Sequence, residues 1–262
     1  GNVKFYTRAL SGAQVLQNYG AHKHLFGVGS IATDGLVFYM DPAKLFPGQT
    51  SITTAYSMIG YATALLQNGV VLSPNYGGVF DFDGASGFMQ IPDSAYWNSN
   101  VFGTATIFSI ECWYKPDVFR DHDAIINKIN PNDGGFYSAG QGASIWSDAN
   151  GFQAVFSSGV QGNPQGSTIQ INFATSVLKW YHLCFTGDGT TLRFYVDGIQ
   201  RGTALVASRT VPVITSSHGP TFGRRVEFMG GQLGNVKLYT RALSGVEVSQ
   251  NYAAHESRFG IG

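Results

Sequence analysis

The carboxylates of this chain are the first residues to consider for catalysis. Glycoside hydrolysis requires two carboxyl groups that face one cleft, and alternate positions of a strand would point them the same way. Glu111 lies in a strand-like run, but the positions two and four further along are Trp113 and Lys115. Asp81 and Asp83 share one strand face, although Asp83 opens an Asp-Gly turn, and this role accounts for it. The sequence also lacks a G-x-S-x-G nucleophile motif, so we predict that the chain is not an enzyme.

Three aspartates in oxygen-rich loops are candidate calcium ligands. Calcium is held by carboxylate and carbonyl oxygens, which such loops supply. Asp83 lies in a Phe-Asp-Gly turn, and Asp121 and Asp123 flank a histidine. The alternative, which we favour, is that all three are solvated turn residues.

Several aromatic residues in predicted loops could stack on sugar rings. Sugar recognition uses exposed aromatic faces with polar groups nearby. Trp97, in the segment SAYWNSN, is the strongest candidate, and the others are Tyr76, Tyr96, Trp146 and Phe228. Arg224 is predicted on a rim, where it could contact an acidic glycan or a neighbouring subunit. For each aromatic residue we favour packing over binding, and for Arg224 we favour a solvated strand end.

Composition narrows the classes of function. The chain has 16 basic and 16 acidic residues, and this balance argues against an electrostatic nucleic-acid binder. No apolar run approaches the ~20 residues that a membrane-spanning helix needs. Gly occurs 34 times and Phe plus Tyr 32 times (19 and 13), as is typical of short strands joined by tight turns. Cys112 and Cys184 are the only cysteines, and we predict both to be free and buried because each lies in an apolar run.

Strand-like segments dominate the chain. Alternation is clear over 190–198, and the Asp-Gly pairs at 188–189 and 197–198 predict hairpin turns within an antiparallel meander over 179–206. Residues 42–77 lack a clear period and predict a long irregular segment with at most one short strand, and 207–222 predict a second loop. The remaining predicted strands are 35–41, 78–83, 87–92, 106–115, 123–129, 142–147, 151–157, 167–174 and 232–240.

One short helix is predicted over roughly 244–253. Ser244 and Glu247 have the spacing of a capping box, in which each side chain binds the other residue's backbone N–H. Leu243 and Val248 have the spacing of a hydrophobic staple. We interpret the helix as a structural latch after the last strand.

The end of the chain repeats its beginning. Residues 1–29 and 234–262 are identical at 20 of 29 aligned positions, at an offset of 233. We predict that residues 1–30 are the closing tail of a preceding repeat and that 31–262 form one complete domain. The strand around Val3, Phe5 and Tyr6 would lack a sheet of its own, so we expect it to pair with a neighbouring subunit. Docking on the same domain is the alternative.

The order of the motifs resembles the laminin-G-like and concanavalin A-like lectin/glucanase superfamily over residues 33–262. The segments that carry the resemblance are LVFYMDPAKLFPG, GGVFDFDGASGFMQIP, FSIECWYKP, WYHLCFTGDGTTLRFYVDG and the last 30 residues. The resemblance implies an all-β fold, a two-sheet antiparallel jelly-roll sandwich with one short C-terminal helix. It also implies a calcium ion at the rim of the sandwich, but Asn235 stands where the family often has an acid, which weakens that expectation. The C-terminal pattern QNY…H…RFG is similar to lectin-like domains in virion proteins of tailed bacteriophages.

These observations predict a non-catalytic structural or assembly module of a virion or another extracellular fibre, built of tandem repeats. The tandem repeat, the zero net charge and the missing carboxylate array support this interpretation. A glycan-binding adhesion module is the alternative, and a glycoside hydrolase is a remote one. We expect protein partners in a homo-oligomeric assembly, cell-surface glycans under the alternative, and a location outside the cell or on a virion surface.

Overall fold

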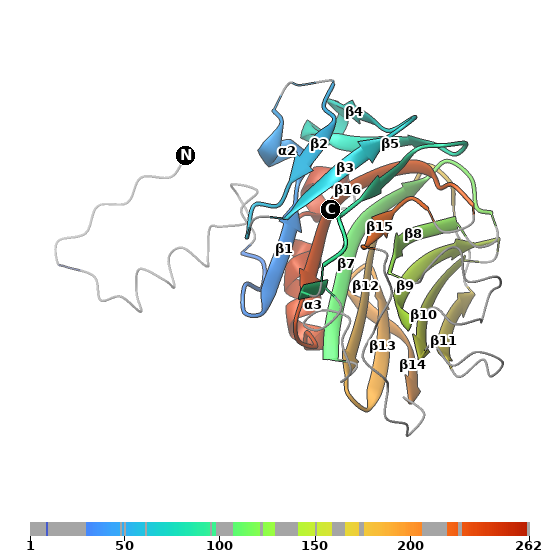
Figure 1. Ribbon diagram of the computed structural model, residues 1–262. Coiled ribbons are helices and arrows are strands. Elements are labelled where there is room, and N and C mark those ends of the chain that lie inside the picture. Colours follow the sequence, from blue (N-terminus) through green and yellow to red (C-terminus); the bar gives the residue numbers. More distant parts are fainter. Residues whose placement is uncertain are drawn as a thin grey trace.

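The structure of the protein is a computed structural model that shows two β-sheets packed face to face (Figure 1). Within the described part of the chain each sheet has eight strands, and every pairing between these strands is antiparallel. This architecture confirms the predicted jelly-roll sandwich. The residues described are 9, 30–47, 49, 51–60, 62–94, 96–97, 107–120, 123–128, 141–149, 151–158, 166–172, 176–205, 219–224 and 227–260.

The first sheet, called sheet A, contains the closing strand of the sandwich. Its order is β14-β13-β12-β7-β16-β5-β4, and β1 also pairs with β16. The strands are β1 (Leu36–Met40), β4 (Val71–Ser73), β5 (Val79–Asp83), β7 (Ile107–Pro116), β12 (Tyr181–Asp188), β13 (Thr191–Val196), β14 (Ile199–Leu205) and β16 (Gly230–Tyr239).

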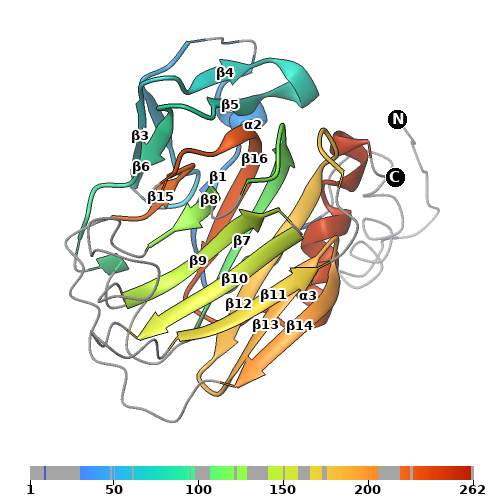
Figure 2. The ribbon, with the colours of Figure 1, turned by 90° about the vertical axis from the view of Figure 1, so that its right-hand side faces the viewer.

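The second sheet, called sheet B, has the order β11-β10-β9-β8-β15-β6-β3-β2. Figure 2 shows β8 to β11 lying across the strands of sheet A. The strands are β2 (Thr54–Tyr56), β3 (Thr63–Gln67), β6 (Phe88–Gln90), β8 (Asp123–Asn127), β9 (Gln141–Asp148), β10 (Gly151–Ser158), β11 (Gly166–Asn172) and β15 (Thr221–Phe222).

The core lies between the two sheets and follows the period of the strands. Leu192, Phe194 and Val196 alternate along β13 and are all buried in it. On the neighbouring strands β7 and β12 of the same sheet, Phe108 packs edge-on against Phe185, with the ring centroids 5.1 Å apart. Phe156 of β10, in sheet B, stacks on Phe108 at 6.1 Å across the core. Burial of this aromatic set provides the main stabilisation of the sandwich, since each such ring removes a large apolar area from water.

The segment 42–77 is more regular than predicted. It contains the helix α2 (Pro42–Leu45), the strands β2, β3 and β4, and the 3-10 turn η2 (Asn75–Gly77). These strands are three to five residues long and lie toward the edges of both sheets, so too few residues alternate to reveal them. The prediction of a loop over 207–222 is also wrong for its last two residues, which form β15 and pair with both β6 and β8.

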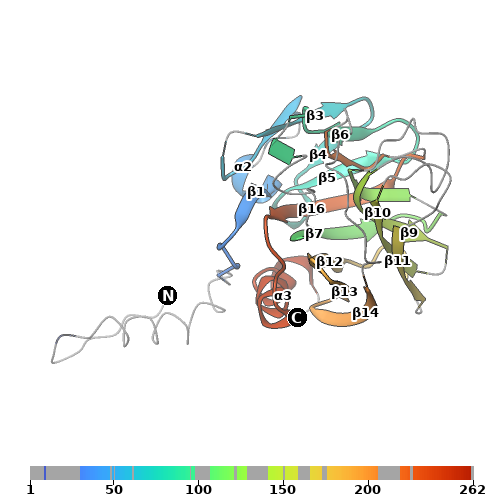
Figure 3. The ribbon, with the colours of Figure 1, turned by 60° about the horizontal axis from the view of Figure 1, so that its bottom comes forward.

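The predicted helix is confirmed as α3 (Gly245–Ala253), followed by the 3-10 turn η4 (Glu256–Phe259). Ser244 accepts a hydrogen bond from the Glu247 amide, and the Glu247 side chain accepts one from the Ser244 amide, which completes the capping box. Leu243 and Val248 are buried in one cluster with Cys184 of β12. Since Cys184 points away from the core between the sheets, α3 covers the outer face of sheet A (Figure 3). Both cysteines are free and buried, as predicted.

Candidate functional site

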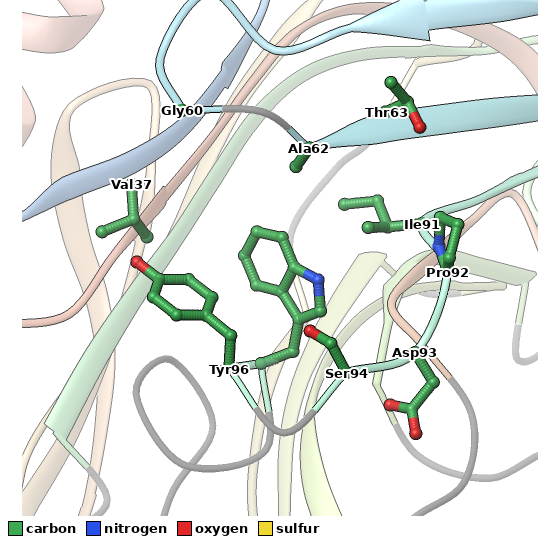
Figure 4. A pocket seen from close by; sticks show the side chains of 10 residues that line it. Val37, Gly60, Ala62, Thr63, Ile91, Pro92, Asp93, Ser94 and Tyr96 are labelled. Atoms are coloured by element: carbon green, nitrogen blue, oxygen red, sulfur yellow. The ribbon is translucent and has the colours of Figure 1, made fainter.

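A pocket of about 480 Å³ opens at one end of the sandwich, beside β1 and the hairpin between β2 and β3 (Figure 4). Three parts of the chain form it: β1, that hairpin, and the segment that follows β6. Its lining residues are Val37, Gly60, Ala62, Thr63, Ile91, Pro92, Asp93, Ser94, Tyr96 and Trp97.

The segment after β6 is fixed to the sandwich by backbone and ring contacts. The Ile91 amide donates to the Pro220 carbonyl at 2.9 Å, which continues the β6–β15 pairing. The Trp97 indole packs edge-on against Phe38 of β1 at 6.1 Å and is only 4% exposed. Trp97 is therefore the floor of the pocket and part of the core. Packing, the interpretation we favoured for this residue, is confirmed, and an exposed ring at this position is wrong.

Tyr96, rather than the stronger candidate Trp97, provides the exposed aromatic surface. Its side chain is 45% exposed, and its ring stands at 84° to the Trp97 indole with centroids 5.2 Å apart. Figure 4 shows its hydroxyl directed toward Val37 and the Ser94 hydroxyl close to the rings. The pocket thus combines an apolar floor, one open aromatic ring and hydroxyl groups at its edge.

The one carboxylate among the described lining residues is already paired. Asp93 lies 3.7 Å from the Nζ of Lys128, a fully buried side chain. Burial lowers the pKa of Lys128 to about 8, and the Asp93 carboxylate opposes that shift. With this single carboxylate, the described lining residues do not offer the two carboxyl groups that glycoside hydrolysis requires. Because that carboxylate is paired with Lys128, the pocket favours a neutral, hydroxyl-rich ligand.

The other predicted sugar-binding residues lie elsewhere. Tyr76 is 38% exposed and packs against Trp180 on the outer face of sheet A, with Lys115 over its ring. Arg224 lies over the rings of Phe88 and Phe228, at 4.7 and 5.5 Å from their centroids. No contact among the described residues joins either of them to the pocket.

Trp146 is buried, as the favoured packing interpretation expected, and it offers no exposed face to a sugar. It lies on the outer face of sheet B and is 2% exposed, in a cluster with Ala124 and Val155. Its indole N–H donates to the Ser144 hydroxyl. The sequence could not show this burial, because it depends on what covers the sheet rather than on the strand's own pattern.

The candidate calcium ligands have different surroundings. Asp83 accepts hydrogen bonds from the amides of Ala85, Ser86 and Gly87 at 2.8–3.0 Å, and these bonds hold the pKa of its carboxyl well below the usual range. It closes a turn, as the favoured alternative expected. Asp121 lies outside the described residues.

Asp123 is the unusual acid of this group, and the favoured prediction that it is a solvated turn residue is wrong. It is fully buried at the start of β8, and neither carboxylate oxygen has a hydrogen-bond partner in the described part of the chain. Burial raises its pKa to about 6, and Arg120 only partly offsets that effect. Among the described residues no three His, Cys, Asp or Glu side chains gather where they could hold a metal ion, so calcium binding stays a prediction.

Glu111 belongs to a buried polar network beneath α3. The Lys237 ammonium lies 2.5 Å from one carboxylate oxygen, and the Asn251 amide donates to the other at 2.6 Å. Burial alone would raise the pKa of Glu111, but Lys237 and His182 outweigh it and hold the pKa below its ordinary value. This structural role was not predicted from the sequence, although Lys237 and Asn251 recur in the first repeat as Lys4 and Asn18 and could have indicated it.

Val3, Phe5 and Tyr6, the predicted intersubunit strand, lie outside the described residues. No helix in the described part of the chain is long and apolar enough to cross a membrane. The boundary between a tail at 1–30 and a domain at 31–262 remains a prediction.

Comparison with known proteins identifies the family to which this architecture is similar. The family model described as "Concanavalin A-like lectin/glucanases superfamily" matches residues 83–249. No curated protein matches the chain.

Solved structures share the fold at low sequence identity. The receptor binding domain of a botulinum neurotoxin C/D mosaic serotype superposes with a TM-score of 0.62 at 12% identity over 83% of this chain and 51% of that one. Botulinum neurotoxin type C, whose cell entry depends on interaction with two ganglioside molecules, gives 0.60 at 15% identity over 83% and 50%. The binding domain of Paraclostridial Mosquitocidal Protein 1 gives 0.60 at 16% identity over 83% and 52%. The chain therefore spans about half the length of these structures.

Proposed function

The chain belongs to the concanavalin A-like lectin/glucanase superfamily, and from this premise we propose that it is a non-catalytic, glycan-binding module. The observation that carries the proposal is the pocket with Tyr96 exposed above the buried Trp97. The superfamily by itself does not decide the matter, because one fold hosts many functions and the argument must rest on the site.

The pocket has the features that sugar recognition requires. An exposed aromatic ring on a rigid support offers a face or edge to the C–H groups of a sugar ring, and Trp97 with Phe38 supplies that support. Thr63 and Ser94 place hydroxyl groups at the edge of the pocket, where they can exchange hydrogen bonds with a sugar. A volume of about 480 Å³ lies in the range of small-ligand sites and suits one or two sugar units.

The structural neighbours support a binding role in a limited way. They are binding domains, and one of the toxins depends on gangliosides, which carry sugar headgroups. At 12–16% identity this similarity concerns the fold alone, so the pocket residues of this chain carry the proposal. A glycan-binding role also suits a location outside the cell.

An assembly role remains a second candidate because of one observation, the repeated segment at 1–29 and 234–262. A virion or fibre built of tandem modules would use such repeats, and glycan binding can coexist with it. The similarity to domains of tailed bacteriophages, and a virion surface as the location, stay predictions.

A glycan array followed by titration calorimetry of the best ligand tests the proposal. The Tyr96→Ala variant should lose about tenfold in affinity, which corresponds to ~1.4 kcal/mol, a typical loss for an aromatic anchor of an interface. Tyr76→Ala is the matched control, since Tyr76 has similar exposure but lies outside the pocket lining, and it should bind as the wild type does. Binding that survives Tyr96→Ala but is lost in Tyr76→Ala would place the site on the outer face of sheet A instead of in the pocket. An array without any bound glycan would refute the proposed function.

A further inference from the structure

A row of side chains on the outer face of sheet B leads away from the edge of the pocket. Figure 2 shows β3, β6 and β15 side by side. Thr63 of β3 lines the pocket, and Leu65 and Gln67 follow at alternate positions of the same strand. On β6, Gln90 and Phe88 are the register partners of these last two. All five are exposed or half-buried, whereas the residues between them pack on the core, so the row faces solvent.

Arg224, two residues after β15, ends this row. Its guanidinium carbon lies 4.7 Å from the centroid of the Phe88 ring and 5.5 Å from that of Phe228. The two rings are 6.3 Å apart, and a β-bridge joins the backbone of Arg224 to that of Phe228. A guanidinium that stacks on aromatic rings keeps its in-plane N–H groups available for another partner. The rings therefore fix the position of the cation without using its hydrogen-bond donors.

No acceptor within the described residues uses the N–H groups of Arg224. Its Nε is buried without a hydrogen-bond partner, whereas its two Nη groups are not among the buried unpartnered atoms and so reach the surface. Glu227 is exposed and forms no ion pair with it in the described part of the chain. Three other arginines, Arg193, Arg241 and Arg258, each bind a carboxylate. Arg224 is thus a fixed cation whose usual partner is missing.

A second arginine makes this part of the surface more positive. Arg120 donates from Nη1 to the carbonyls of Gly84 and Phe228, at 3.1 and 3.4 Å, and neither acceptor carries a charge. The acids nearby are Asp123, which is fully buried, and Glu227, which is exposed. Two guanidinium groups therefore face one exposed carboxylate, and this excess of positive charge favours an anion.

We propose that Arg224 binds the carboxylate of an acidic sugar, which makes this module specific for glycans with an acidic unit beside the unit in the pocket. The inference rests on the proposed function. A carboxylate can accept two parallel N–H bonds from one guanidinium, the strongest arrangement for this pair of groups. The side-chain amides of Gln67 and Gln90 lie on the same face and make no hydrogen bond within the described residues, so they can exchange hydrogen bonds with the hydroxyl groups of the same sugar.

The spacing allows one glycan to occupy both places. An antiparallel strand rises about 3.4 Å per residue, so Gln67 lies about 14 Å from Thr63 at the pocket edge. Gln67 is the register partner of Phe88, on which Arg224 stacks. A short oligosaccharide with a neutral unit against Tyr96 can therefore place its acidic unit at Arg224 along an exposed strand face.

Paired oligosaccharides test this specificity. Uronate-containing oligosaccharides from the glycan array are compared with the same compounds after each carboxyl group has been reduced to an alcohol. Titration calorimetry at pH 7 and low ionic strength should give about tenfold tighter binding of the acidic member, the low end for a hydrogen bond to a charged group. Added salt should reduce this preference, because the Arg224 Nη groups reach solvent.

Substitution of Arg224 separates recognition from folding. Arg224→Gln should abolish the preference and still bind the reduced member as the wild type does, which also shows that the variant is folded. Arg201→Gln is the matched control, because Arg201 is exposed on β14 of sheet A without an ion pair among the described residues, and it should keep the tenfold preference. Arg224→Lys keeps the charge but not the two parallel N–H groups, so it should retain only about a threefold preference. This variant carries the test if Arg224→Gln does not fold.

The outcomes distinguish this inference from the proposed function. Equal affinity of the wild type for both members of a pair, or a preference that survives Arg224→Gln, would overturn the inference alone if binding still depends on Tyr96. Failure to bind either member would refute the proposed function.

The arginine can also be tested without the pocket. Methyl β-D-glucuronide is titrated into the ¹⁵N-labelled chain, and the Nε–H resonance of Arg224 is followed by nuclear magnetic resonance. A saturable shift of this resonance supports the inference. No shift, or a larger shift with inorganic sulfate at the same concentration, would overturn the assignment of a sugar carboxylate.

Discussion

Replacing Lys237 by methionine tests how strongly the buried network closes the sandwich. Methionine keeps most of the side-chain volume but removes the cation that lies 2.5 Å from Glu111. Both side chains are fully buried, so the variant leaves a carboxylate uncompensated in a low-dielectric site. Removing one partner of such a pair costs about 3–5 kcal/mol. For a domain of this size, ~2–4 °C per kcal/mol gives a fall in melting temperature of roughly 6–20 °C.

Thermal unfolding followed by circular dichroism at pH 7 measures this loss. Lys179→Met is the matched control, because the Lys179 side chain is 50% exposed and its ion pair at 3.8 Å should contribute little. The double variant Glu111→Gln, Lys237→Met should recover part of the loss, since an amide is neutral and can still accept from Asn251. A Lys237→Met variant as stable as the wild type, or no recovery in the double variant, would refute this account of the network.

The pH dependence of the same variant gives an independent check. In the wild type the pKa of Glu111 is lower in the folded state, so its stabilising contribution is present above the unfolded pKa of about 4.5 and is lost as the pH falls below it. Without Lys237, burial raises the pKa of Glu111, and the variant regains stability when the carboxyl is protonated. The difference between wild type and variant should therefore be smaller at pH 4 than at pH 7, and a constant difference would contradict the reasoning.

Three further predictions follow from other parts of the structure. Trp97→Ala should lower stability by about 3–5 kcal/mol in a denaturant titration because it removes a core ring, and a loss under 1 kcal/mol would contradict its burial. Gly234→Ala should cost about 1–3 kcal/mol, since its Cβ would meet Phe259, and an unchanged melting temperature would show that the ring moves freely. Asp123→Asn should raise the melting temperature at pH 7, because the folded carboxyl with a pKa of about 6 opposes folding when ionised; the gain should shrink as the pH falls below 6 and disappear only below the unfolded pKa of about 3.8. If the same substitution lowers the melting temperature only when millimolar calcium is present, Asp123 is a calcium ligand and this interpretation is wrong.

The elements with a local signal could be predicted from the sequence. The alternation over 190–198 corresponds to β13, and the Ser244–Glu247 spacing gave the capping box of α3. Both signals arise from residues a few positions apart, whose geometry is set by the period of the element itself.

The parts that depend on distant contacts could not be predicted in this way. Whether Trp97 or Tyr96 faces solvent depends on Phe38, about 60 residues earlier, and the pocket joins three separate segments. The pairing of Glu111 with Lys237 spans 126 residues and is visible only once the strand register is known. The short strands within 42–77 form because neighbouring strands supply their partners, and their own sequences carry little alternation.

A crystal structure with the best ligand of the glycan array is the most direct test of the proposed binding role. We predict that a sugar ring lies against Tyr96, between the β2–β3 hairpin and the segment that follows β6, with its hydroxyl groups near Thr63 and Ser94. Ligand density against Tyr76 or Arg224, with this pocket empty, would contradict the central claim.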